Sequence, residues 1–292
     1  MVKIAVASGK GGTGKTFIST NIFHSLLDNN VSAELIDCDA EAPNAIPFFN
    51  TDIQKAEEVN QHVPVIDTDI CTFCGKCHDY CNYNAIFILP EVKVIKVIED
   101  LCHDCGACYY ACKYGAITEK SFPLGKITSN LDESKNILIE AKMNIGVLSP
   151  VRVIQAAIKS SRDNNGITVL DSPPGTSCPF IQTVSAADYV ILVTEPTPFG
   201  LSDLRQSVDT LRELGKPFGV IINRAGIGND DVESYLTDEK IELLLEVPFS
   251  KDIASAYSKG LLISGNNKMF SRQLYEITMK IAKRYGNSNN KR

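Results

Sequence analysis

Eight of the ten cysteines in this chain fall between residues 71 and 112, as two copies of the spacing C-x2-C-x2-C-x3-C. The copies are offset by 31 residues, so that Cys71 recurs as Cys102 and Gly75 recurs as Gly106. Small repeats of this kind normally stack to share a core that neither copy could build alone. Reduced cysteines gathered in clusters usually hold metal. The array therefore predicts a compact metal-binding domain of its own.

The spacing also predicts which cysteines hold which metal centre. Three thiolates of a C-x2-C-x2-C run wrap one [4Fe–4S] cluster, and the fourth cysteine of each copy reaches the cluster of the other copy. On this rule the ligands of one cluster are Cys71, Cys74, Cys77 and Cys112. The ligands of the second cluster are Cys102, Cys105, Cys108 and Cys81. Gly75 and Gly106 lie where the chain must bend tightly around the metal.

The array resembles the bacterial two-cluster ferredoxin module over its whole length. The proline that usually follows the fourth cysteine is replaced by Asn82 and Lys113, a departure that concerns the local turn and leaves the ligands in place. Structural zinc also takes four thiolates, but it does not require this doubled pattern. The sequence that ends in Cys77 and His78 matches the C-x-x-C-H motif of haem attachment, yet it lies wholly inside the array. We therefore expect His78 to be a surface residue.

Outside the array, apolar and β-branched runs alternate with helical patterns. Strands are expected at residues 2–7, 31–36, 167–170, 189–194, 218–222 and 243–247, and helices at 15–27, 201–214 and 269–285. This alternation is typical of an α/β fold with a parallel sheet covered by helices on both faces. We expect a mostly parallel α/β domain of residues 1–66 and 119–292, with residues 67–118 inserted as a small α+β domain.

A glycine-rich loop between the first expected strand and helix, residues 9–16, fits G-x4-G-K-[ST]. Backbone N–H groups of such a loop converge on phosphate oxygens, and the helix N-terminus adds positive potential. Lys15 would neutralise phosphate charge, and the Thr16 hydroxyl would ligate Mg2+. The expected nucleotide-binding residues of the loop are Gly11, Gly12, Thr13, Gly14, Lys15 and Thr16.

A second lysine in the loop, Lys10, carries a closer resemblance. Lys10-Gly-Gly-Thr-Gly-Lys-Thr resembles the deviant Walker A loop of the MinD/ParA/nitrogenase-iron-protein superfamily. In that superfamily the extra lysine reaches across a dimer to the partner's nucleotide. The resemblance therefore implies an ATP-dependent homodimer in which Lys10 and Lys15 both take part in ATP hydrolysis. Over its full length, the chain resembles the MinD-superfamily ATPases that carry an inserted two-cluster ferredoxin domain.

Further motifs of that superfamily match residues at the ends of expected strands. By the switch I match, Asp39 positions the attacking water and Asp37 supports the Mg2+ shell. By the match to Walker B and switch II, Asp171 lies near Mg2+ through water, and the Gly175 amide senses the γ-phosphate. Open α/β sheets bind ligands at strand ends, which favours these assignments together.

Three more residues complete the site that the resemblance implies. Asn223 resembles the residue that contacts adenine, and Pro248 would flank the ring together with Phe249. Asn44 resembles a further switch residue. Asn223 alone would be an ordinary strand-end asparagine, so its assignment rests on the order of the motifs.

The composition restricts the classes of partner that we expect for this chain. The 292 residues include 29 basic and 35 acidic side chains, a net charge of -6, whereas nucleic-acid binding needs clustered basic charge. No apolar run approaches the ~20 residues of a membrane span. The N-terminal apolar stretch stops at Ser8, too short for the core of a signal peptide. We expect a cytoplasmic protein with no nucleic-acid partner.

A switch ATPase and an electron carrier in one chain imply that the two activities are coupled. By similarity to the nitrogenase iron protein, we expect ATP-gated electron transfer through two [4Fe–4S] clusters. The dimer state would alter how the clusters are exposed to a redox or cluster-accepting protein partner.

Other members of the superfamily give alternative functions. Iron–sulfur cluster carriers of the Mrp type use a C-x-x-C in the C-terminal half, and none follows Cys112. Cys178 lies where the nitrogenase iron protein places a cluster ligand, and Cys38 lies in switch I, but we expect Cys178 to be a small buried thiol. The amide-forming enzymes of the cobyrinate type need a glutaminase region, which no remaining segment is long enough to supply.

A MinD-type spatial organiser would need a membrane-binding C-terminal helix. An apolar stripe at helical spacing does lie near the C-terminus: Phe270, Leu274, Ile277 and Ile281. Such a stripe usually faces the protein core, so we do not expect a membrane partner.

Overall fold

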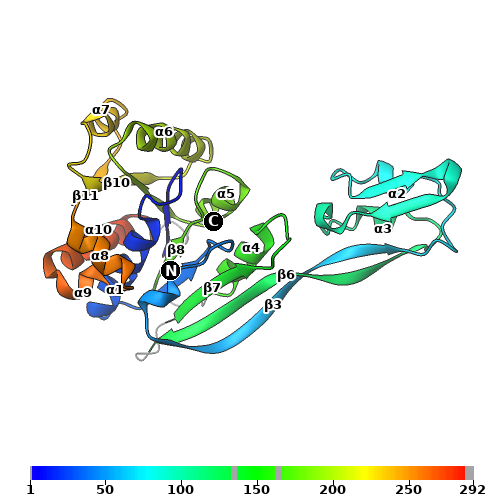
Figure 1. Cartoon of the computed structure of the whole chain (residues 1–292), viewed down its shortest axis with the longest axis horizontal. Coiled ribbons are helices and arrows are strands. Elements are labelled where there is room, and N and C mark those ends of the chain that lie inside the picture. Colours follow the sequence, from blue (N-terminus) through cyan, green and yellow to red (C-terminus); the bar gives the residue numbers. More distant parts are fainter. Residues whose placement is uncertain (1, 133–136, 162–165, 287–292) are drawn as a thin grey trace. The chain divides into compact units, whose positions relative to one another are not determined.

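The computed structural model describes residues 2–132, 137–161 and 166–286, and the chain forms two compact units (Figure 1). The first unit comprises Met1–Glu57, Ile127–Lys142 and Val151–Arg292. The second unit comprises Glu58–Lys126 and Met143–Pro150. The insertion expected at residues 67–118 falls inside the second unit, which extends past both of these boundaries and adds a separate later segment.

The sheet of the first unit places its strands in the order β11-β10-β9-β1-β8-β2-β7, followed by β6 and β3. Their bounds are β1 Val2–Ala7, β2 Ala33–Asp37, β3 Thr51–Ile66, β6 Ile117–Asp132, β7 Ile137–Met143, β8 Ile167–Asp171, β9 Tyr189–Thr194, β10 Phe218–Ala225 and β11 Leu243–Pro248. The pairings from β11 to β7 are parallel, as the alternation of strands and helices predicts. The carboxyl ends of these strands therefore meet along one edge of the sheet.

The helices of the first unit pack on this sheet and on one another (Figure 1). Their bounds are α1 Lys15–Asp28, α4 Val151–Lys159, α5 Cys178–Ser185, α6 Pro198–Glu213, α7 Asp231–Asp238, α8 Lys251–Ser258, α9 Ile263–Asn266 and α10 Lys268–Tyr285. The Thr197 hydroxyl accepts the Gly200 N–H at the start of α6, and the Asn267 side chain accepts the Phe270 N–H at the start of α10. These caps satisfy backbone donors that a helix start leaves free.

The C-terminal helix turns its apolar stripe toward the protein core, as expected. Phe270, Leu274 and Ile281 are buried in one cluster with residues of α1, and Phe270 stacks on Phe17 with ring centroids 5.7 Å apart. Ile277 packs against the same cluster while partly exposed. Within the described parts of the chain, every helix is too short or too polar to cross a membrane.

The repeat in the cysteine-rich sequence is also a repeat of backbone conformation. Three pairs of residues related by the 31-residue offset adopt positive φ angles: Phe73 and Asp104, Gly75 and Gly106, and Asn84 and Gly115. Around them lie α2 Lys76–Asp79, α3 Ala107–Ala111 and an antiparallel pair, β4 Ile86–Leu89 and β5 Val94–Val97. The buried centre of this unit is small, formed by Cys77, Ile86 and Ile117. A core of this size needs further cross-linking for stability, which a metal cluster can supply.

Two long strands were not expected from the sequence. β3 and β6 have 16 residues each, and the chain passes from one unit to the other within each of them. Residues 52–58 of β3 are all exposed, so this stretch carries no apolar alternation that marks a half-buried strand.

Candidate functional site

The glycine-rich loop forms one side of an open cavity of about 370 Å3. The cavity lies at the carboxyl ends of the parallel strands, where ligands bind in open α/β sheets. The expected site residues that line it are Gly11, Gly12, Gly14, Lys15, Thr16, Asp39, Asn44, Asn223, Pro248 and Phe249. Thr13, Asp37, Asp171, Gly175 and Lys10 lie outside this lining, and their contacts are described below.

The loop has the backbone conformation that its glycines permit. Gly12 and Gly14 have φ angles of 80° and 101°, in the region that side-chain-bearing residues rarely adopt. A Cβ added at Gly14 would lie 2.3 Å from Nδ2 of Asn223, so the close approach also requires glycine. The Thr13 hydroxyl is buried and has no hydrogen-bond partner among the described residues.

Lys15 begins α1 and is almost completely buried. Its ammonium donates to the Lys10 carbonyl oxygen at 3.4 Å. Burial lowers the pKa of Lys15, while Asp171 and Asp39 act in the opposite direction. A cation held in a desolvated position is well suited to a phosphate group, because the charge interaction strengthens as water is excluded.

Asp37 and Asp171 are register partners at the ends of β2 and β8, and both are buried. The Asp37 carboxylate accepts three backbone N–H groups, from Asp39 at 3.1 Å, Asn44 at 2.8 Å and Ala45 at 2.9 Å. It therefore fixes the segment that follows β2, which includes Asp39. The resemblance places Asp37 in the Mg2+ shell, whereas in the structure both of its oxygens already bind backbone.

Neither carboxylate oxygen of Asp171 has a donor in hydrogen-bonding geometry among the described residues. Burial raises the pKa of Asp171 to about 6, while the hydroxyls of Thr16 and Ser19 and the charge of Lys15 oppose that rise. Burial also raises the pKa of Asp37 well above its ordinary value, and the charge of Asp171 adds to this. Orphaned carboxylate oxygens beside the Thr16 hydroxyl fit Mg2+, which prefers oxygen ligands and retains several waters.

Asp39 faces the cavity from the loop after β2. Burial raises its pKa, and the Ala42 N–H and the Lys15 charge lower it in part. The Gly175 N–H, by contrast, donates to the Ser8 carbonyl oxygen at 3.1 Å. In this conformation the Gly175 amide is engaged within the protein, so contact with a phosphate requires that this bond opens.

The other end of the cavity is formed by β10, β11 and α8. Asn223 Nδ2 donates to the Thr13 carbonyl oxygen at 2.8 Å, and its Oδ1 accepts the Arg224 N–H at 3.0 Å. Asn223 therefore ties the glycine-rich loop to the end of β10. Pro248 is the last residue of β11, Phe249 follows it, and both line the same end of the cavity.

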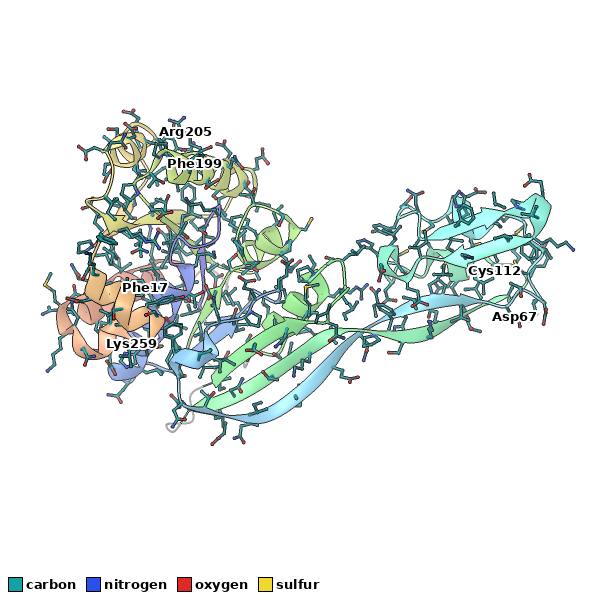
Figure 2. All side chains as sticks on the ribbon, viewed as in Figure 1. Phe17, Asp67, Cys112, Phe199, Arg205 and Lys259 are labelled. Carbon is teal, nitrogen blue, oxygen red and sulfur yellow. The ribbon has the colours of Figure 1, made fainter. Side chains whose placement is uncertain are left out.

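Sequence reasoning missed one wall of this cavity and one ion-pair network beside it. The wall comes from α1 and α8, namely Phe17, labelled in Figure 2, with Ile253, Ala254 and Tyr257. Lys10 instead points to Glu195, with its ammonium 2.9 Å from Oε1. Glu195 directly follows β9, and its place at a strand end, which also supports the motif-based assignments of Asp39 and Asn223, was the available signal.

The second unit contains two further cavities, each surrounded by four cysteines. The first is lined by Cys71, Cys74, Cys77 and Cys112. The second is lined by Cys81, Cys102, Cys105 and Cys108. Cys112, labelled in Figure 2, directly follows α3. The four cysteines around each cavity are the four that the spacing groups together.

Backbone N–H groups point at the sulfurs in equivalent places of the two repeats. The Phe73 N–H donates to Cys71 Sγ at 3.4 Å, and the Asp104 N–H donates to Cys102 Sγ at 3.5 Å. Such bonds favour the thiolate form, whereas burial raises the pKa of Cys108 to about 11. Among the described residues, no three His, Cys, Asp or Glu side chains gather closely enough to hold a single metal ion.

The structure also shows the exposure of His78 and of the two cysteines outside the array, Cys38 and Cys178. His78 is exposed, as expected, and its Nδ1 lies 2.6 Å from the Ile86 carbonyl oxygen. Cys38 is fully buried after β2. The expectation that Cys178 is a buried thiol is wrong: Cys178 is exposed, because it is the first residue of α5 and follows the helix cap outside the core.

Comparison with known proteins identifies the family. The model of the family described as "CobQ/CobB/MinD/ParA nucleotide binding domain" matches residues 4–263. The chain is 34% identical over 266 residues to the uncharacterized protein MJ0579 of Methanocaldococcus jannaschii, which covers 89% of this chain and 90% of that protein. The chain therefore belongs to the CobQ/CobB/MinD/ParA family of nucleotide-binding domains.

Two more distant similarities are to proteins with different names. An iron-sulfur cluster carrier protein of Rickettsia felis is 23% identical over 262 residues, covering 88% of this chain and 64% of that protein. The septum site-determining protein MinD of Pyrococcus horikoshii, solved in complex with Mg-ADP, superposes with a TM-score of 0.57 at 17% identity, covering 99% of this chain and 97% of the other. At this identity, the second likeness establishes the fold.

The raised pKa of Asp171 predicts a pH-dependent affinity for Mg2+. Protons and Mg2+ compete for the same oxygens, and protonation removes the negative charge that attracts the ion. We expect the affinity for Mg2+–nucleotide, measured by calorimetry between about pH 8 and pH 5, to fall below about pH 6 by up to about tenfold per pH unit. Asp171→Asn keeps the nucleotide's own titration and serves as the control. If both proteins show the same pH profile, Asp171 does not ligate the ion.

Proposed function

We propose that this member of the CobQ/CobB/MinD/ParA family is an ATP-hydrolysing switch that couples ATP-driven dimer formation to electron transfer through two [4Fe–4S] clusters. One observation carries the proposal. The same chain places a glycine-rich nucleotide loop beside an orphaned buried carboxylate, and it gathers eight cysteines into two four-cysteine cavities.

The nucleotide half of the proposal assigns a task to each charged group. Lys15 and the loop amides bind the phosphates, while Thr16 and Asp171 hold Mg2+, which neutralises charge on the phosphates. Asp39 faces the cavity and orients a water for in-line attack. Asp37 acts indirectly, because its three bonds to backbone hold the loop that carries Asp39.

The dimer half rests on the family resemblance of Lys10. A lysine from the second subunit completes the charge around the γ-phosphate, so the lone subunit hydrolyses ATP slowly. Hydrolysis then removes the group that holds the subunits together. The cycle of ATP binding and hydrolysis becomes a cycle of association and release.

The cluster half is supported by the donor sets. Four thiols line each cavity, and backbone N–H groups approach Cys71, Cys81 and Cys102. A cube of four irons and four sulfides needs a wider spacing of thiolates than a single zinc ion, whose four thiolates lie about 3.8 Å apart at Zn–S distances of about 2.3 Å. When bound, such clusters would carry one electron each to or from a protein partner.

A second candidate function is cluster delivery. The named activity of the Rickettsia felis relative favours it. Against it, no C-x-x-C follows Cys112, and outside the cysteine array the exposed Cys178 is accompanied only by the buried Cys38. Delivery predicts that clusters leave the protein for an acceptor apoprotein, whereas electron transfer predicts that they stay and change oxidation state.

The cluster assignment predicts an iron count. Anaerobic reconstitution should give about eight irons and eight sulfides per chain, with visible absorption. Cys105→Ser should lose one cluster, about four irons, because it removes a ligand of the second cavity alone. Cys178→Ser is the matched control and should keep the full count, since Cys178 lies on α5. Stoichiometric zinc without visible absorption would exclude this half of the proposal.

The nucleotide assignment predicts that binding and hydrolysis can be separated. Lys15→Ala should abolish ATP binding because the buried phosphate cation is lost. Asp39→Ala should bind ATP with little change and lower the hydrolysis rate by about 10²-fold or more, the scale seen when one transition-state contact is removed. Fluorescent-nucleotide binding and phosphate release measure the two effects. Normal turnover in Asp39→Ala would mean that another group orients the water.

A further inference from the structure

One carboxylate beside the glycine-rich loop is shared by two cations. Lys10 Nζ lies 2.9 Å from Glu195 Oε1, and Arg224 Nη1 lies 2.7 Å from Glu195 Oε2. The three residues come from separate segments: the loop after β1, the residue that follows β9, and the end of β10. The Glu195 side chain is only 12% exposed, whereas those of its two partners are 30% and 47% exposed.

We propose that Glu195 holds Lys10 within its own subunit and so sets the ATP concentration at which this lysine becomes available to the nucleotide of a second subunit. Glu195 is thus a positioning residue that acts through Lys10. The inference rests on the proposed function, because it takes from there that Lys10 serves across a dimer.

The geometry makes the two positions of Lys10 mutually exclusive. At 2.9 Å from a carboxylate oxygen, the ammonium is already neutralised. A phosphate of a second subunit can approach this ammonium only if the pair with Glu195 opens, since the two anions otherwise repel each other. The γ-phosphate supplies a stronger anion than a carboxylate. ATP can therefore displace Glu195, whereas ADP lacks the group that would do so.

Arg224 keeps this exchange from leaving a buried charge unpaired. Removing one partner of a desolvated ion pair is costly because the remaining charge is uncompensated. When Lys10 leaves, Glu195 still has Arg224, which also donates from Nη2 to the Gly12 carbonyl oxygen at 3.3 Å. Only one of the two pairs needs to break.

Glu195 is charged under the conditions where the switch would operate. Burial alone would raise its pKa, but hydrogen bonds and charge from Lys10 and Arg224 lower the pKa below its ordinary value. The Lys10 pair is partly exposed, so its loss should change the association equilibrium modestly, by about three- to tenfold in ATP concentration.

The test is sedimentation of the full chain, titrated with a slowly hydrolysed ATP analogue and, separately, with ADP. Glu195→Gln removes the charge at constant shape and should associate at about three- to tenfold lower analogue concentration than the wild type. Glu195→Asp keeps the charge and should move back toward the wild type. Glu242→Gln breaks the Lys280–Glu242 pair of 2.8 Å elsewhere on the first unit and should have no effect.

A double variant separates the route through Lys10 from a direct effect of Glu195. In Lys10→Ala the substitution Glu195→Gln should change nothing, because the lysine that it would release is gone. Lys10→Ala alone should not associate with the analogue, and association of the double variant would overturn the inference. So would association of Glu195→Gln without nucleotide, since Glu195 would then repel the second subunit directly.

The outcomes also distinguish this inference from the function on which it rests. If the wild type associates with the analogue and Glu195→Gln requires the same or a higher concentration, the inference is wrong and the dimer switch stands. If the wild type stays monomeric over the range of analogue concentrations while Glu195→Gln associates with the analogue alone and not with ADP or without nucleotide, both are supported. If neither protein associates with any nucleotide, the dimer switch is rejected and the role of Glu195 with it.

Discussion

The site depends on the parallel pairing of β2 and β8, which places Asp37 opposite Asp171. Two carboxylates that are buried side by side are unfavourable unless each finds a partner. Asp37 is satisfied by three backbone N–H groups, and so it orders the loop that carries Asp39. Asp171 is left without a hydrogen-bond donor among the described residues. This asymmetry turns one carboxylate into a structural support and leaves the other for a cation.

The two lysines of the glycine-rich loop interact with different carboxylates. Lys15 is buried, where Asp171 and Asp39 act on its pKa, and it belongs to the phosphate position of its own subunit. Lys10 is partly exposed and pairs with Glu195 outside the cavity. In the proposed function, this loop of eight residues thus carries one cation for the nucleotide of its own subunit, Lys15, and one whose partner can be exchanged, Lys10.

Sequence predicted the parts of the site that short motifs encode. The glycine-rich loop and the grouping of the cysteines follow from spacing. Asp37 and Asp171 follow from the resemblance of their motifs to the superfamily, supported by the edge at which parallel strands end. The other features of the site depend on tertiary contacts that short motifs do not encode. Tyr257 reaches the cavity from a helix far along the chain, Glu195 matches no motif, and the exposure of Cys178 depends on how α5 begins. β3 was missed because its polar residues carry no periodic pattern.

The proposed function requires that the nucleotide state controls the two proposed clusters. The most direct measurement is the midpoint potential of the reconstituted clusters, taken anaerobically by redox titration without nucleotide, with ADP and with a slowly hydrolysed ATP analogue. The account predicts a shift with the ATP analogue alone, of the order of 59 mV for a tenfold change in a one-electron equilibrium, and its loss in Lys10→Ala. Identical potentials in all three states, with the dimer formed, would contradict the coupling.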